Sequence, residues 1–103
     1  MRYHTVLLTA VMFATTATAH AAGDAAKGGT MASTKCASCH GAHGEGMAKN
    51  PKLAGLTAEY IETQLKAYQS GTRQHMMMTG IAKKLSEQDI ADVAAFFASQ
   101  PAK

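Results

Sequence analysis

The chain has 103 residues, a formal net charge of +3 and no tryptophan, and only 6% of its residues are aromatic. A chain of this length forms one small domain with a thin hydrophobic core, and such a domain usually needs a disulfide, a metal or a bound cofactor for stability. The longest basic run, Lys83-Lys84, has no aromatic residues interleaved with it, which argues against a nucleic-acid-binding surface.

Residues 1–22 are predicted to form a signal peptide. They begin with a short segment that carries Arg2 and continue in an apolar run over residues 6–14. This run is too short to span a bilayer, and the small residues Ala19-His20-Ala21 that follow it are typical of a cleavage site. We therefore expect cleavage near residues 19–22 and a soluble domain over residues 23–103, located outside the cytoplasm.

The remainder of the chain is predicted to be helical, because it shows no alternating strand pattern and no internal repeat. Asp24 is a suitable N-cap for a first helix that runs toward the cysteines. Gly28 and Gly29 within it lower the helix stability by about 1 kcal/mol each relative to Ala. Residues 41–56 are rich in glycine and contain Pro51, so a loop is expected there.

A second helix is predicted over residues 57–70, beginning at Thr57 and ending at Gly71. Its apolar stripe consists of Ile61, Leu65 and Tyr68. This spacing places the three side chains on one face of the helix, where we expect them to pack in the core. A second loop is predicted for the segment TRQHMMMTG, residues 72–80.

The last helix is predicted to begin at Ser86, with Asp89 three residues later in the position of a capping-box carboxylate. Its apolar stripe consists of Ile90, Val93, Ala94 and Phe97. Pro101 is expected to end this helix. The predicted fold class is therefore all-α.

The stretch KCASCHGAHGEG holds the only two cysteines of the chain, Cys36 and Cys39, and His40 follows them directly. A disulfide between them would close a very small loop and add little stability. A thioredoxin-like redox pair needs a βαβ context that the sequence lacks, and a structural zinc site needs four ligands. CxxCH is the attachment signal of c-type haem, and this interpretation fits an exported helical chain best.

The chemistry of haem attachment explains the order of the three residues. Two thiols about one helical turn apart can add across the two vinyl groups on one side of the porphyrin. His40 then presents its imidazole to the iron from one face. We therefore predict one covalently bound haem c, with Cys36 and Cys39 attached to the porphyrin and His40 as an iron ligand.

An ordered series of further residues extends the motif along the chain. Its members are Cys36, Cys39, His40, Gly41, Gly44, Gly46, Pro51, Leu53, Ala54, Gly55, Tyr60, Gln64, Leu65, Gly71, Arg73, Met78, Ile81, Ala82, Leu85, Ser86 and Phe96. The series resembles the small class I cytochromes c, especially the single-haem relatives of cytochromes c4 and c553. The resemblance implies a small cytochrome c fold, with helices packed around one covalently bound haem. Leu56 departs from it, because many relatives carry Gln at this position.

The resemblance implies Met78 as the ligand on the second face of the iron. A thioether is a soft, neutral ligand that favours ferrous iron, and His/Met ligation raises the reduction potential. From the residues alone, the run Met76-Met77-Met78 offers three candidates, with Met77 second to Met78, and His75 offers a bis-histidine alternative. A methionine that is not a ligand would serve as an apolar cover over the haem face.

The resemblance also implies two residues that support the haem site. A ligating histidine generally donates its other ring N–H to an acceptor that fixes the ring, and relatives use a proline carbonyl for this, here Pro51. Relatives pair an arginine before the methionine segment with a haem propionate, here Arg73, which would offset the cost of burying that charge. Without the resemblance, Pro51 would be a plain turn proline and Arg73 an exposed charge.

Iron held on both faces by protein side chains has no position for a substrate, so the expected function is electron transfer and not catalysis. We predict a periplasmic one-electron carrier that docks transiently on redox partner proteins, with no nucleic acid and no transmembrane segment. Three alternatives stay open. The chain could be the haem subunit of a larger dehydrogenase, a haem protein whose open sixth site binds peroxide, CO or NO, or a copper-binding module that uses the HMMM run.

Overall fold

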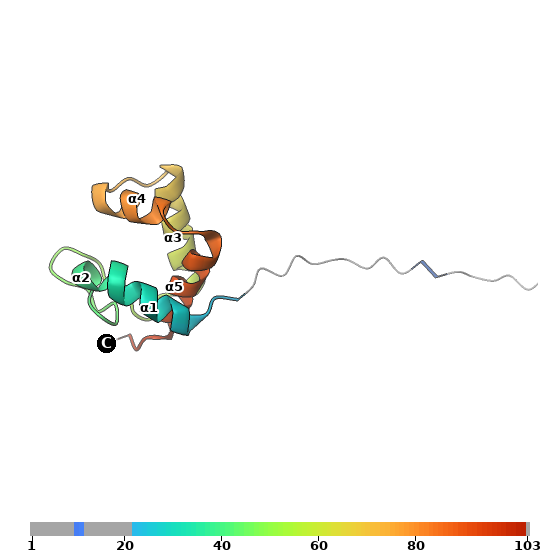
Figure 1. The fold of residues 1–103 in the computed structure, drawn as a ribbon, viewed down its shortest axis with the longest axis horizontal. Coiled ribbons are helices and arrows are strands. Elements are labelled where there is room, and N and C mark those ends of the chain that lie inside the picture. Colours follow the sequence, from blue (N-terminus) through green and yellow to red (C-terminus); the bar gives the residue numbers. More distant parts are fainter. Residues whose placement is uncertain (1–9, 12–21, 103) are drawn as a thin grey trace, which may run out of the picture.

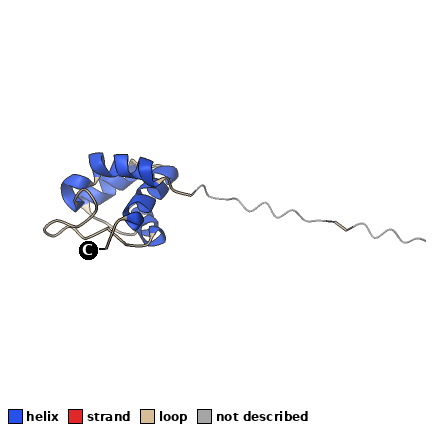
Figure 2. Ribbon diagram, turned by 90° about the horizontal axis from the view of Figure 1, so that it is seen from below, coloured by secondary structure: helices blue, strands red, loops and turns tan. Residues whose placement is uncertain are grey.

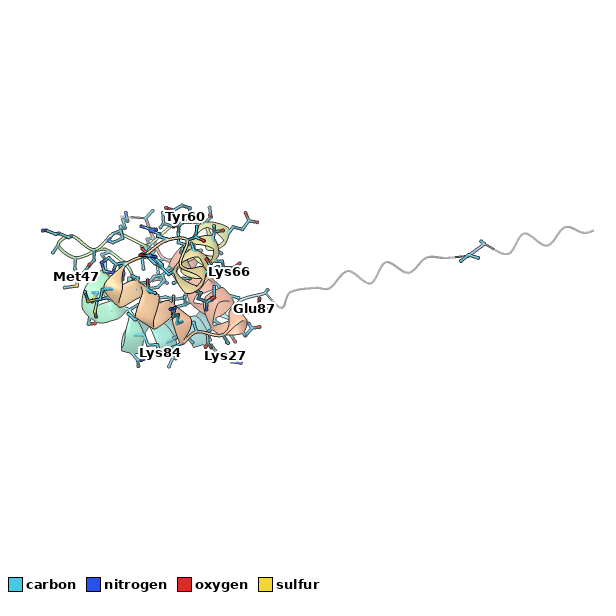
Figure 3. The ribbon with its side chains drawn as sticks, turned by 90° about the horizontal axis from the view of Figure 1, so that it is seen from above. Lys27, Met47, Tyr60, Lys66, Lys84 and Glu87 are labelled. Atoms are coloured by element: carbon cyan, nitrogen blue, oxygen red, sulfur yellow. The ribbon has the colours of Figure 1, made fainter. Side chains whose placement is uncertain are left out.

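The computed structural model describes residues 10–11 and 22–102, and over these residues the chain is helical without a strand (Figure 2). The elements in chain order are α1 (Ala25–Lys35), α2 (Ala37–His40), α3 (Ala58–Ser70), α4 (Met76–Lys83) and α5 (Glu87–Ser99). This confirms the all-α fold class. The predicted signal peptide lies outside the described residues except for residues 10, 11 and 22. Among the helices described, none is both long enough and apolar enough to cross a bilayer.

Helices α1 and α3 both pack against α5. Helix α1 lies against α5, α3 contacts both α5 and α4, and the short α2 follows directly from α1. In Figure 1, α2 and α4 lie on the same side of the domain, away from the N-terminal end of α1. The two segments that carry the cysteine motif and the methionine run are therefore brought to one side of the fold.

The first helix crosses α5 closely because of a glycine. Asp24 caps α1, and its side chain accepts hydrogen bonds from the backbone N–H groups of Ala26 and Lys27. Gly28 is buried at the crossing, and a Cβ added there would overlap the backbone carbonyl of Asp92 in α5. The residue that lowers the propensity of α1 is thus the one that lets two backbones approach. Asp92 itself is only 3% exposed, and its Oδ1 accepts a hydrogen bond from Asp24 N at 2.7 Å.

The apolar stripes predicted for α3 and α5 form the core. Its buried members on these two helices are Ile61, Leu65, Tyr68, Ile90, Val93, Ala94 and Phe97. Ser86 and Asp89 form the predicted capping box at the start of α5, and Thr57 caps α3. Gly71 adopts a left-handed conformation after α3, at φ 82°, which ends the helix as expected.

The loop predicted over residues 72–80 is wrong in its second half, because α4 begins at Met76. Methionine favours helix, but eight residues that include Gly80 are too few for a helix to be stable by itself. Tertiary contacts stabilise it. The side-chain amide of Gln69 in α3 donates to the carbonyl oxygens of Ala82 and Leu85, each at 2.8 Å, and the Ala82 side chain is fully buried.

Candidate functional site

The two cysteines lie where α1 gives way to α2. Cys36 ends the first helix and begins the second, and the backbone N–H of His40 donates to its carbonyl oxygen at 2.9 Å. This bond closes one helical turn, so both cysteines and the histidine belong to a single turn of helix. Cys36 and Cys39 are half-buried free thiols. Burial raises the pKa of Cys36, outweighing the opposing influence of Lys35, so its thiol is neutral at pH 7.

The imidazole of His40 is fixed from one side. His40 is only 7% exposed, and its Nδ1 lies 2.8 Å from the carbonyl oxygen of Pro51. Because a carbonyl only accepts, Nδ1 carries the hydrogen and donates it, and Nε2 of the neutral ring keeps a free lone pair. That nitrogen is the one available to a metal.

The glycine-rich loop over residues 41–56 keeps this arrangement in place. Its contacts to α2 include one that sequence analysis missed, since the side chain of Asn50 donates to the carbonyl oxygen of Cys39 at 2.9 Å. The backbone N–H of Gly46 donates to the carbonyl oxygen of His40 at 2.8 Å. Gly44 has φ 77° and is buried, with no room for a Cβ beside the ring of Phe97. Gly44 therefore lets the loop backbone approach both α5 and the backbone of Ala54.

The three consecutive methionines differ sharply in environment. Met76 is 91% exposed and Met77 58% exposed, whereas Met78 is half-buried and packs against the core. His75, the bis-histidine candidate, is exposed and caps α4, and its Nδ1 accepts a hydrogen bond from Met78 N at 3.3 Å. Sequence analysis missed this capping role, for which the only signal was the position of His75 directly before the methionine run.

Arg73 lies on the surface beside α3. Its Nη1 donates to Gln64 Oε1 at 2.6 Å, and its guanidinium carbon lies 4.9 Å from the centroid of the Tyr68 ring. The two contacts hold the guanidinium against one face of α3, so this charge is oriented before any partner binds.

A separate cavity of about 290 Å³ lies where the loop meets the end of α5. It is lined by His43, Glu45, Ala54, Gln100 and Pro101. None of the predicted site residues lines it. His43 Nδ1 lies 3.1 Å from Gln100 Oε1, and backbone N–H groups of Glu45 and His43 lower the pKa of the Glu45 carboxyl.

The residues present fit a covalently attached haem. One turn supplies two free thiols and an imidazole with one nitrogen hydrogen-bonded and the other available, and α4 supplies a half-buried thioether. A zinc site fits less well. In the described part of the chain, no group of three or more His, Cys, Asp and Glu side chains is arranged to hold a metal ion.

A family model described as cytochrome c matches residues 25–101. The chain is 50% identical over 86 residues to cytochrome c4 of Pseudomonas aeruginosa, covering 82% of the chain and 42% of that protein. It is 46% identical over 83 residues to cytochrome c-554(548) of Halomonas halodenitrificans, covering 77% of the chain and 99% of that protein. It thus spans less than half the length of the first relative and nearly all of the second.

The chain is also similar to one further curated protein and to a solved structure. A thiosulfate dehydrogenase electron acceptor of Stutzerimonas stutzeri is 42% identical over 77 residues, covering 73% of the chain and 36% of that protein. The fold is similar to the crystal structure of reduced cytochrome c4 from Pseudomonas stutzeri, with a TM-score of 0.72 and 38% identity. That match covers 78% of the chain and 47% of the solved one.

Proposed function

The chain belongs to the cytochrome c family, and on that premise we propose that it is a one-electron carrier with a single haem c. The observation that carries the proposal is the geometry at His40. Its Nδ1 is held by Pro51 at 2.8 Å, which leaves Nε2 available beside two free thiols on the same helical turn. When bound, the haem supplies an iron that changes between its ferrous and ferric states.

In this proposal each site residue has one task. Cys36 and Cys39 attach the porphyrin through thioether bonds, and His40 binds the iron through Nε2. The Pro51 carbonyl holds the imidazole in one tautomer and orientation, as is usual for ligating histidines. A ring already fixed in the protein would lose little freedom on binding the iron.

Met78 is proposed as the second protein ligand of the iron. Its half-buried position against the core supports this, in contrast to the exposed Met76 and Met77. A thioether favours ferrous iron and raises the reduction potential. Two protein ligands also keep water and small molecules from the iron, which separates a carrier from a haem enzyme.

Arg73 is proposed to supply the positive charge for a haem propionate. Its contacts with Gln64 and the Tyr68 ring support the role, since an arginine already held in place loses little side-chain entropy when it pairs. We further propose export to the periplasm after removal of residues 1–22, and transient docking on redox partner proteins. Interfaces of this kind are small, below about 1,200 Å² of buried surface.

The proposal is tested by spectroscopy on the protein purified from cells that mature c-type cytochromes. We expect one haem per chain that survives acid–acetone extraction, and a sulfur-to-iron charge-transfer band in the oxidised protein. Met78→Ala should lose this band and bind CO readily when reduced, whereas the matched control Met76→Ala should keep the band. Extractable haem would contradict covalent attachment, and a band that persists in Met78→Ala would assign the sixth ligand to another residue.

A second candidate is a haem subunit of a larger dehydrogenase, favoured by the similarity to the thiosulfate dehydrogenase electron acceptor. Both candidates use the same haem site and differ only in what the chain is bound to. Size-exclusion chromatography of the periplasmic extract separates them, because a carrier elutes as a small protein and a subunit elutes with its dehydrogenase. Haem absorbance confined to the high-mass fractions would favour the subunit.

A further inference from the structure

His75 and the first turn of α4 cap each other reciprocally. The backbone of His75 is extended, with φ −156° and ψ 128°, so it lies just outside the helix in the N-cap position. Its Nδ1 accepts from the backbone N–H of Met78 at 3.3 Å, and its own backbone N–H donates to Thr79 Oγ1 at 3.2 Å. Two backbone donors at this end are thereby satisfied by side chains, as in a capping box.

This contact selects one tautomer of the neutral His75 ring. Because Nδ1 accepts from a backbone amide, its lone pair is engaged and the hydrogen of the neutral ring sits on Nε2. In that tautomer neither nitrogen has a lone pair free for iron. The capping contact therefore excludes His75 from the ligand role for as long as the contact lasts.

The two ends of α4 are held by different means. Gln69 of α3 holds the C-terminal end through the carbonyl oxygens of Ala82 and Leu85. At the N-terminal end, Met76 and Met77 are largely exposed and add little packing, and only the Met78 side chain of this turn packs against the core. An eight-residue helix is marginal without outside support, so the cap adds to the one packing contact that holds the first turn.

We propose that His75 is a positioning residue that keeps the first turn of α4 closed and so holds the Met78 thioether in place. The inference rests on the proposed function, in which Met78 is the sixth iron ligand. The amide that His75 caps belongs to the same residue as the thioether. Opening the cap therefore releases the backbone from which that side chain extends.

The test compares His75→Ala, which removes the side-chain acceptor, with His75→Asn, which keeps one. Asparagine is among the best N-cap residues, and alanine is a poor one. Two quantities are measured on the haem-loaded protein: the hydrogen-exchange rate of the Met78 amide and the apparent affinity of the oxidised protein for added imidazole. Imidazole binds the iron only where Met78 has moved away, so its affinity reports the open population.

We expect His75→Ala to speed exchange at the Met78 amide and to raise the apparent imidazole affinity about fivefold, the equivalent of about 1 kcal/mol for a lost cap. His75→Asn should restore both quantities to near the original values. Unchanged exchange and affinity in His75→Ala would overturn the inference. Equal changes in the two variants would also overturn it, because they would show a need for the imidazole itself.

The experiment separates this inference from the proposed function beneath it. A protein with His75 intact that lacks the sulfur-to-iron band would overturn Met78 as a ligand, and the positioning role with it. A protein that has the band, but whose Met78 amide exchanges at the same rate in His75→Ala, would overturn the positioning role alone.

Discussion

The crossing of α1 and α5 can be tested by replacing Gly28 with alanine. A Cβ at this position would overlap the carbonyl of Asp92, which is backbone and cannot rotate away. Overpacking of this kind costs about 1–3 kcal/mol, and a backbone obstacle places the cost near the upper end of that range. Alanine returns about 1 kcal/mol of helix propensity, so about 3 less about 1 leaves a net loss of about 2 kcal/mol.

Gly80 provides the matched control. It lies in the interior of α4, and outside the backbone of α4 itself no atom of the described residues lies within 4 Å of an added Cβ. Gly80→Ala therefore gains helix propensity without a clash and should raise the stability by up to about 1 kcal/mol. The two variants make the same chemical change in two helices and differ only in what surrounds it.

The assay is thermal unfolding of the haem-loaded protein followed by circular dichroism. For a domain of this size, a loss of about 2 kcal/mol lowers the Tm by roughly 10 °C, and the control should raise it by up to about 5 °C. A Gly28→Ala variant as stable as the original protein, or more stable, would refute the close crossing of α1 and α5.

Three further predictions concern the methionine run, the buried Asp92 and the capping box of α5. Under graded hydrogen peroxide, peptide mass mapping should find sulfoxide at the 91% exposed Met76 before the half-buried Met78, and the reverse order would contradict the burial of Met78. The pKa of Asp92 is lowered, chiefly by the hydrogen bond from the Asp24 backbone N–H and then by the side chain of Gln88. The ionised Asp92 carboxylate therefore contributes stability above the ordinary carboxyl pKa, and this stability is lost as the pH falls through the lowered pKa. Asp92→Asn should be less stable than the original protein in denaturant unfolding, and this loss of stability should shrink below about pH 4. A loss of stability that does not depend on pH would exclude the charge as its cause. Ser86→Ala should cost about 1 kcal/mol in the same assay, and an unchanged midpoint would contradict the capping box at α5.

Local sequence signals predicted most of the helical framework. The stripes of α3 and α5, the capping box at Ser86 and the glycine stop at Gly71 all depend on residues within one or two turns of each other. The loop predicted over residues 72–80 failed in its second half for the opposite reason. Helix α4 is too short to be stable alone, and the Gln69 contacts that support it come from another helix.

The sequence by itself indicated the kind of site, because CxxCH spaces two thiols and an imidazole so that one helical turn can carry all three. The family resemblance singled out Met78 among the three methionines, but only the tertiary structure shows that Met78 packs against the core while Met76 is exposed to solvent. Only the tertiary structure also shows that Gly28 allows the backbones of α1 and α5 to approach closely. The exposure of a side chain and the distance between two backbones depend on two elements in contact, so the sequence pattern of one element cannot predict them.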